Sequence, residues 1–249
     1  MIILKSKKEL EIMREAGRIT AGALHIVQKN IRPGVTTGEL NALAEEYILG
    51  HNARPAFKGY NGFPASICSS INAQVIHGFP GEVELQEGDI ASIDIGAFYK
   101  GYCGDAARTF PVGNISGGAV ALIQTTRQSF FEGLKYARLG YRLSDISHAI
   151  QSYVEARGFS VVKSFVGHGI GQRMHEDPQV PNFGPGGLGP RLRPGMTLAI
   201  EPMVNQGTDE VDILEDGWTV LTRDRRLSAH YENTIAITDG EPTILTLEG

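Results

Sequence analysis

LQEGDIASID, residues 85–94, returns in changed form as LRPGMTLAIE, residues 192–201, at an offset of 107 positions. Each copy has a Gly-containing turn, then an apolar run typical of a buried strand, and then an acid, which is Asp94 in one copy and Glu201 in the other. Chance similarity is the alternative, and the matching acids at both strand ends weigh against it. The two stretches therefore predict a duplicated unit with its acids in equivalent places.

A second pair of segments repeats at almost the same interval. IRPG at residues 31–34 matches ARLG at residues 137–140, at an offset of 106 positions. The apolar helix positions that come after each of these two segments match at the same offset. The interval is longer than a solenoid unit and only two copies fit, so we expect one pseudo-two-fold α/β domain over residues 1–249. Its halves run roughly over 6–112 and 113–238, with no separate amino-terminal domain.

The composition limits the class of protein. The 249 residues are 41% hydrophobic and 20% charged, which is enough to bury a full core. The net charge of -5 argues against an extended basic surface for nucleic acid. No signal peptide and no run of about eighteen apolar residues is evident, so we expect a cytoplasmic protein that does not enter a membrane. Two cysteines, Cys68 and Cys103, are predicted to be reduced thiols.

Two helices are predicted in the first fifty residues. Ser6 and Glu9 form a capping box in front of a long helix with apolar residues at helical spacing. Thr37 is the expected cap of the second helix, and Gly50 is expected just past its end.

Five residues in the last two-thirds of the chain indicate the chemistry. Asp94, Asp105, His168, Glu201 and Glu232 lie in apolar, strand-like or Gly-rich settings, where an unpaired charge is costly and no cationic partner is near in sequence. Four carboxylates and one imidazole form a hard ligand set that can hold two divalent ions. Each residue alone can be read as a solvated loop acid, an edge-strand acid or a structural histidine. Their combination favours a dinuclear metallohydrolase.

Strand patterns give the expected places of the first two acids. Ile90–Ile95 and Arg108–Val112 are predicted strands on either side of a Gly-rich segment. Asp94 and Asp105 should then face each other across a hairpin or between neighbouring strands, where a shared cation would remove their repulsion.

The other three residues are expected in different settings. His168 is predicted in a Gly-rich turn over residues 166–171, where small neighbours allow close approach of the ring. Glu201 is predicted at the end of a strand that Pro202 stops, and Glu232 on a strand over residues 229–237.

Six short motifs run through almost the whole chain: SIDIG at 92–96, GYCGD at 101–105, GHGIG at 167–171, MHEDP at 174–178, AIEP at 199–202 and HYENT at 230–234. Together they resemble the type I methionine aminopeptidases. The resemblance implies the pita-bread fold, an α/β (α+β) fold with internal pseudo-symmetry in which helices flank a central antiparallel sheet.

The resemblance also implies a role for each candidate ligand. Asp94 would chelate one metal ion, His168 and Glu201 would hold the other, and Asp105 and Glu232 would bridge them. The two divalent ions could be Co, Mn, Fe or Zn, because the ligand set does not distinguish them. A metal-activated water would attack the first peptide bond, and Glu201 would shuttle its proton to the leaving amine.

Further residues match the family outside the metal ligands. His77 and His175 would donate to the scissile amide or to the oxygen that gains charge in the transition state. A pocket for the methionine side chain, where aromatic and sulfur groups suit a thioether, would be formed by Phe57, Tyr60, Phe63, Cys68, Met174 and Trp218. Phe57 stands where some relatives carry cysteine, and Cys103 where many carry histidine, so the sequence departs from the family pattern at these two positions.

The resulting hypothesis is a metal-dependent exopeptidase that removes the initiator methionine from new proteins when the second residue is small. It would act as a monomer on peptide or nascent-chain amino termini, with transient ribosome association and no specificity for nucleic acid. One alternative is a proline-directed aminopeptidase or dipeptidase of the same fold, although such enzymes usually carry an extra amino-terminal domain. The other is a non-catalytic binding protein of that fold, although such proteins typically lose ligands that this chain retains.

Overall fold

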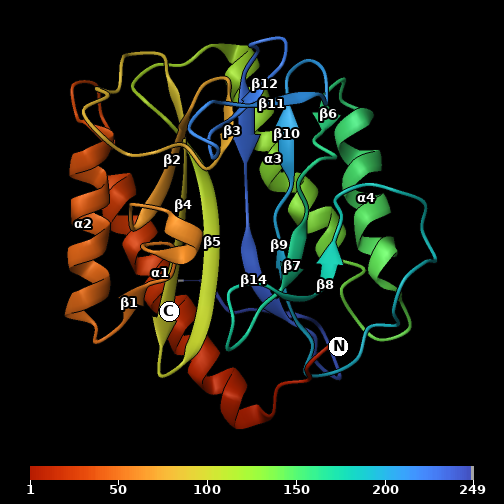
Figure 1. Cartoon of the computed structure of the whole chain (residues 1–249). Helices are drawn as coiled ribbons and strands as arrows, with labels where there is room; N and C mark the ends of the chain where they lie inside the picture. The colour runs from red at the N-terminus through yellow and green to blue at the C-terminus, as the bar shows by residue number, and fades with distance from the viewer. Residues whose placement is uncertain (248–249) are drawn as a thin grey trace.

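The computed structural model describes residues 1–247, in which helices pack against antiparallel sheets, as predicted (Figure 1). The α-helices of this part of the chain are α1 (Lys7–Asn30), α2 (Thr37–Gly50), α3 (Gly117–Leu134) and α4 (Leu143–Glu155), and a short 3₁₀ helix, η1, covers Tyr60–Gly62. Figure 1 shows α1 and α2 on one side of the molecule and α4 on the other, with the sheets between them.

The strands of the described residues form four sheets, and their pairings are antiparallel. One sheet holds β1 (Arg54–Pro55), β2 (Ile67–Ile71), β4 (Ile90–Tyr99) and β5 (Tyr102–Pro111). Another has the order β15 (Thr243–Ile244), β14 (Asn233–Ala236), β9 (Thr197–Ile200), β7 (Gly167–Gly169), β8 (Glu176–Val180). The two three-stranded sheets are β13 (Ser228–His230), β10 (Met203–Asn205), β6 (Ser160–Val161) and β11 (Val211–Ile213), β12 (Val220–Thr222), β3 (Gln74–Ile76).

The first two helices begin at capping boxes. Ser6 caps α1 together with Glu9, as predicted. The predicted cap of α2 is wrong by one position, because Thr36 is the cap and Thr37 is the first helical residue. The Thr36 hydroxyl accepts from the Glu39 amide, and the Glu39 carboxylate accepts from the Thr36 amide, a reciprocal pair that Thr37 lacks. Gly50 is the last residue of α2 rather than the residue after it.

The hairpin β4–β5 is longer than predicted, because the Gly-rich segment between the two predicted strands belongs to them. Only Lys100 and Gly101 form the turn, with φ of 45° and 83°. A Cβ on Gly104 would lie 2.8 Å from the Gly17 Cα of α1, and one on Gly96 would lie 2.8 Å from the Phe57 ring. These glycines therefore permit close packing within strands and do not mark a loop.

The two repeated segments have equivalent structures. Gly34 and Gly140, with φ of 85° and 93°, precede α2 and α4. Gly88 and Gly195, with φ of 94° and 86°, precede β4 and β9. These matches support an internal repeat, while its division into residues 6–112 and 113–238 stays a prediction.

Each pair of helices covers its own pair of strands. One buried cluster joins Ile19 of α1 and Leu40 of α2 to Ile93 of β4. A second joins Ile146 of α4 to Leu198 of β9, along with other residues of α3 and β14. Apolar packing against the helices therefore stabilises the positions of β4 and β9, next to which or on which candidate ligands lie. Among residues 1–247, no helix combines the length and the apolar character needed to cross a bilayer.

Candidate metal centre and substrate pocket

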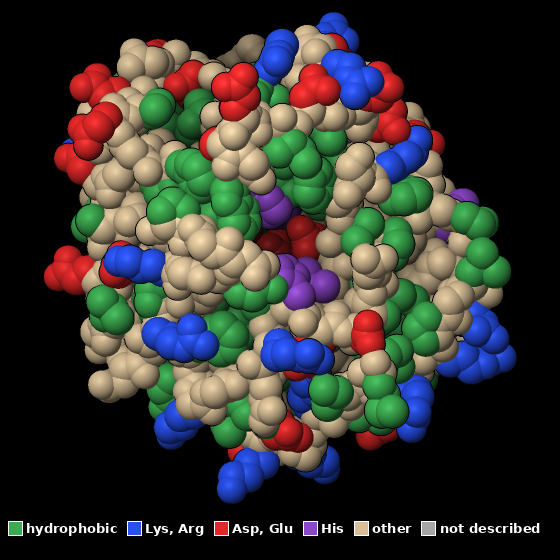
Figure 2. Space-filling view, in the orientation of Figure 1, with side chains coloured by type: hydrophobic (Ala, Val, Ile, Leu, Met, Phe, Trp, Pro, Cys, Tyr) green, Lys and Arg blue, Asp and Glu red, His purple; other side chains and the backbone are tan. Residues whose placement is uncertain are grey.

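One cavity of about 260 Å³ contains every site residue predicted from the sequence. Its lining consists of Phe57, Tyr60, Asn61, Phe63, Cys68, His77, Asp94, Asp105, His168, Met174, His175, Glu201, Trp218 and Glu232. Figure 2 shows its mouth as a hollow with acidic side chains at the bottom, histidines beside them and apolar side chains around the rim. Residues that are far apart in sequence thus meet in one place.

The hairpin β4–β5 supplies the first two carboxylates. Asp94 pairs with Ala107 and Asp105 pairs with Gly96, so the two acids are diagonal neighbours on one face and not directly opposite each other. Thr234 fixes the backbone of Asp105, because its hydroxyl accepts from the Asp105 amide at 3.0 Å and lies 2.9 Å from the Asp105 carbonyl oxygen. This contact joins β5 to β14.

Glu201 and Glu232 lie opposite each other at a break between two sheets. Glu201 directly follows β9, as predicted, but Glu232 lies between β13 and β14 and not on one continuous strand over residues 229–237. Ile200 pairs with Asn233 in one sheet, and Met203 pairs with His230 in another. Pro202 has no N–H to donate to a strand ladder, so the pairing stops beside it. The facing segment is interrupted at the same level, between His230 and Asn233.

His168 lies in strand β7 and not in the predicted turn. It pairs with Ala199 of β9, and a Cβ on either neighbouring glycine would lie within 2.3 Å of a backbone oxygen. Gly167 and Gly169 therefore allow close strand packing. In a sequence, glycines with this role cannot be distinguished from glycines that form a turn. The His168 Nδ1 lies 2.9 Å from the Gly169 carbonyl oxygen, which can only accept, so Nδ1 carries the proton. The lone pair of Nε2 is left for a ligand.

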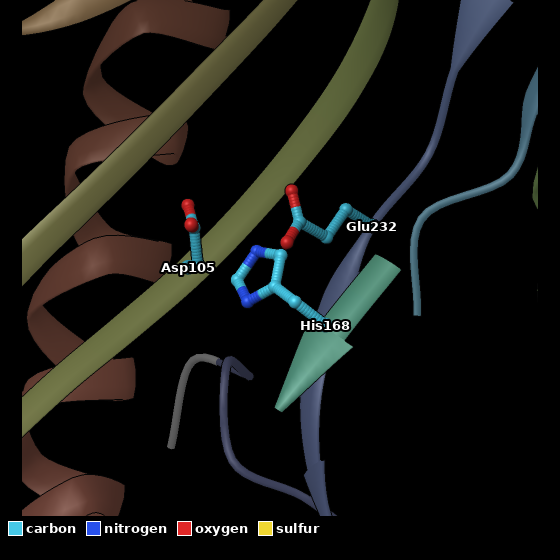
Figure 3. Close-up of side chains that lie close together, drawn as sticks. All are labelled: Asp105, His168 and Glu232. Atoms are coloured by element: carbon cyan, nitrogen blue, oxygen red, sulfur yellow. The ribbon is translucent and has the colours of Figure 1, made fainter. Parts of the chain in front are cut away.

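Three of the predicted ligands form a compact group. Ligand atoms of Asp105, His168 and Glu232 all lie within 4.8 Å of one another (Figure 3). The His168 Nε2 is also 3.5 Å from Glu201 Oε1. In Figure 3 the imidazole reaches from β7 toward the Glu232 carboxylate, with Asp105 projecting from β5.

The cluster of acids is electrostatically incomplete by itself. Burial, followed by repulsion from Asp105, raises the pKa of Asp94, Glu201 and Glu232 well above the usual range, and burial raises that of Asp105 to about 7. Within residues 1–247, one side-chain oxygen of each of Asp94, Asp105 and Glu232 is buried without a hydrogen-bond partner. Buried oxygens of this kind fit divalent cations, which would supply both the missing contacts and the missing charge.

Two histidines line the cavity beside the acids. Burial, with a smaller contribution from His175, lowers the pKa of His77 to about 4, and burial also lowers the pKa of His175. The His77 ring packs edge-on against Trp218, and the His175 Nδ1 lies 2.7 Å from the Tyr60 hydroxyl. Both rings are therefore neutral near pH 7 and can donate one hydrogen bond each.

The rest of the cavity wall is apolar. Phe63 packs against Trp218 at 5.1 Å between ring centroids and against Phe57 at 6.5 Å. Cys68 is a buried thiol whose pKa is raised by burial and then by Asp94, so it stays neutral. Aromatic, thioether and thiol groups beside a hard ligand set can hold a flexible apolar side chain next to a reacting amide.

Sequence reasoning missed two residues near the centre. Asn61 lines the cavity from η1 with a φ of 48°. His230 is buried, with its Nε2 3.7 Å from Glu201 Oε2 and with no hydrogen-bond partner for Nε2 among the described residues. It belongs to the HYENT motif, and its position two residues before Glu232, on the same face of an extended chain, is the signal that could have identified it.

Comparison with known proteins agrees with this geometry. The sequence profile of metallopeptidase family M24 matches residues 11–239. The methionine aminopeptidase of Clostridium perfringens is 59% identical over 99% of both chains. The crystal structure of methionine aminopeptidase from Thermotoga maritima has a TM-score of 0.98 and 46% identity, with all of both chains covered.

A more distant structure supports the fold alone. The prolidase of Pyrococcus horikoshii has a TM-score of 0.81 and 23% identity, and the match covers all of this chain but 65% of the prolidase.

Proposed function

Because the chain belongs to metallopeptidase family M24, and within it to the methionine aminopeptidases, we propose that it releases the amino-terminal methionine of peptides and proteins by hydrolysis in the cavity described above. The predicted pita-bread fold and peptidase activity are confirmed by this membership. The observation that carries the proposal is one cavity that joins five hard ligands to an aromatic and sulfur-containing wall.

We propose that the five ligands hold two divalent ions. Asp94 would bind one, His168 and Glu201 the other, and Asp105 and Glu232 would lie between them. The buried, unpartnered oxygens and the unprotonated Nε2 of His168 support this assignment. Ions bound there would lower the pKa of a coordinated water and polarise the carbonyl of the scissile bond. Co, Mn, Fe and Zn are all compatible with the ligands.

The protein side chains would handle the protons. Glu201 has its carboxylate at the junction of the two sheets, where it can take a proton from the attacking water and deliver it to the leaving amine. If the Tyr60 hydroxyl donates to His175 Nδ1, His175 carries its proton on Nε2 and can donate it to the carbonyl oxygen of the substrate. His77, which also lines the cavity, would donate to the scissile amide.

Specificity for methionine is proposed to come from the apolar wall. Ligand cavities for drug-sized molecules are about 300–1,000 Å³, and this smaller cavity suits a single side chain with its adjoining peptide bond. The small size of the second substrate residue is expected from the family. We propose action as a monomer in the cytoplasm on nascent-chain amino termini, with transient contact to the ribosome.

The proline-directed alternative makes a different prediction about substrates. Its relatives in the comparison are below 25% identity and support the fold alone. Purified enzyme should therefore release methionine from Met-Ala-Ser and should leave an Ala-Pro peptide intact. Preference for the Ala-Pro peptide would refute the proposed substrate.

Metal dependence is tested on the same peptide. Enzyme treated with a chelator should lose turnover, and adding Co²⁺, Mn²⁺, Fe²⁺ or Zn²⁺ separately should identify the metals that restore it. Full turnover in chelator, with metal content confirmed as zero, would refute the metal mechanism. Failure of every peptide to be cleaved by metal-loaded enzyme would favour the non-catalytic alternative.

A further inference from the structure

A buried ion pair links the amino-terminal segment to the edge of the active site. Lys5 Nζ lies 2.5 Å from Glu176 Oε2, and the two side chains are 4% and 1% exposed. The same ammonium donates to the Ile3 carbonyl at 3.2 Å. Glu176 directly follows His175 in the chain and is the first residue of β8, so this pair lies next to a residue of the proposed mechanism. Neither Lys5 nor Glu176 has a role that their sequence neighbourhood indicates.

Glu176 also closes the turn that carries Met174 and His175 into the cavity. Its second oxygen, Oε1, accepts from the Arg173 amide at 3.2 Å, while Oε2 receives Lys5. Residues 171–175 have no helix or strand of their own. The Glu176 carboxylate is therefore a fixed point on which this irregular turn is held, and Lys5 fixes the carboxylate.

The surrounding backbone is shaped to admit the Lys5 side chain. A Cβ on Gly171 would lie 2.4 Å from Lys5 Cε and 2.6 Å from Glu176 Oε1. The Lys5 amide donates to the Gly195 carbonyl at 2.7 Å, which anchors its backbone against the turn before β9. In Figure 1 the amino terminus lies close to β8, in agreement with an ion pair between the Met1 amine and Asp177.

Stability alone is a poor explanation for such a pair. Burying two charges carries a desolvation penalty that their attraction often only offsets, and apolar side chains of similar volume are often equally stable. A carboxylate held at two oxygens does fix the direction of the chain beside it. From this arrangement we infer that Lys5 and Glu176 are positioning residues, which hold His175 and Met174 in place for the proposed peptidase reaction, on which this inference rests.

The inference is tested with three variants assayed on Met-Ala-Ser at saturating metal: Lys5→Met, Glu176→Gln and the double variant Lys5→Met/Glu176→Met. The single variants should lower the melting temperature by about 10 °C, since each leaves one charge unpaired in the interior. The double variant should recover most of that loss, because both charges are gone. In all three, kcat should fall about 10- to 100-fold, because a displacement of about 1 Å is sufficient for such a loss.

Ile150→Ala provides the matched control. Ile150 is fully buried in the cluster around α4 and does not line the cavity, so its truncation should lower the melting temperature without changing kcat at the assay temperature. A second measurement needs neither metal nor turnover. The ring nitrogen signals of His175 in metal-free, ¹⁵N-histidine-labelled protein should shift in the double variant and stay unchanged in Ile150→Ala.

The outcomes separate this inference from the function on which it rests. If the wild-type enzyme fails to release methionine, the proposed function is refuted. If the wild type is active and the double variant regains both stability and kcat, or leaves the His175 signals unmoved, the pair has only a structural role and the inference is overturned. The inference is supported if the double variant recovers stability while its kcat stays reduced and its His175 signals are shifted. If a single variant does not fold, the double variant still decides the question.

Discussion

Replacing Tyr60 by phenylalanine removes one hydroxyl and leaves the aromatic ring of the pocket in place. The lost contact is the 2.7 Å hydrogen bond to His175 Nδ1. A neutral hydrogen bond of this kind contributes about 1 kcal/mol net. Without it, the imidazole is free to carry its proton on Nδ1, which would take the donor away from the substrate side. If the bond must be present in the transition state, 1 kcal/mol corresponds to about a five-fold loss of kcat.

The assay for Tyr60→Phe is steady-state release of methionine from Met-Ala-Ser, with kcat and KM measured separately. KM should change little, because the ring still covers the apolar wall. Tyr136→Phe serves as the control, since Tyr136 is 37% exposed and does not line the cavity. Equal kcat values for Tyr60→Phe and the wild type would refute the reasoning that the hydroxyl sets the proton position on His175.

Three further predictions concern metal, catalysis and the chain's own terminus. Above about pH 7.5 the histidines are almost entirely neutral in the folded and unfolded states, whereas the buried carboxylates, including Asp105 with its pKa of about 7, still bind more protons when folded. The free energy of unfolding of chelated protein should therefore fall as the pH rises above 7.5. Urea titrations at about pH 7.5 and 8.5 measure this, and no fall in chelator would contradict it. His77→Ala should lose turnover but retain metal, whereas Glu201→Ala should lose turnover and metal. Metal analysis and activity measurements on the same samples test this. A fully active His77→Ala enzyme would remove that residue from the mechanism. Met1 should be retained in the purified protein because Ile2 is bulky, and an intact mass lower by one methionine would be the contrary result.

The residues that meet in one cavity could be proposed from the sequence more fully than the local structure around them. Charged residues inside apolar runs stand out wherever they fall in a chain, because burying them requires a partner. The five ligands could therefore be proposed without knowing their elements. Glycine carries no such information, since it serves tight turns and close strand packing equally. Gly167 and Gly169, which pack against neighbouring backbone, were for this reason interpreted as part of a turn.

Contacts between distant segments could not be predicted. Lys5 and Glu176 are 171 positions apart, and nothing near either residue indicates its partner. The proximity of His230 to Glu201 likewise becomes visible only in the folded chain. The cap of α2 is a smaller case, in which two adjacent threonines fit the cap position and only Thr36 has an acid three residues later.

The long separations within the site have a consequence for synthesis of the protein. Asp105 contacts Thr234 across 129 positions, and Lys5 contacts Glu176 across 171. Contacts of this kind form only after the intervening chain is available. A growing polypeptide thus contains none of the completed centre until residue 232 and the strand after it have left the exit tunnel. An enzyme that trims other new proteins would remain inactive during almost the whole of its own translation.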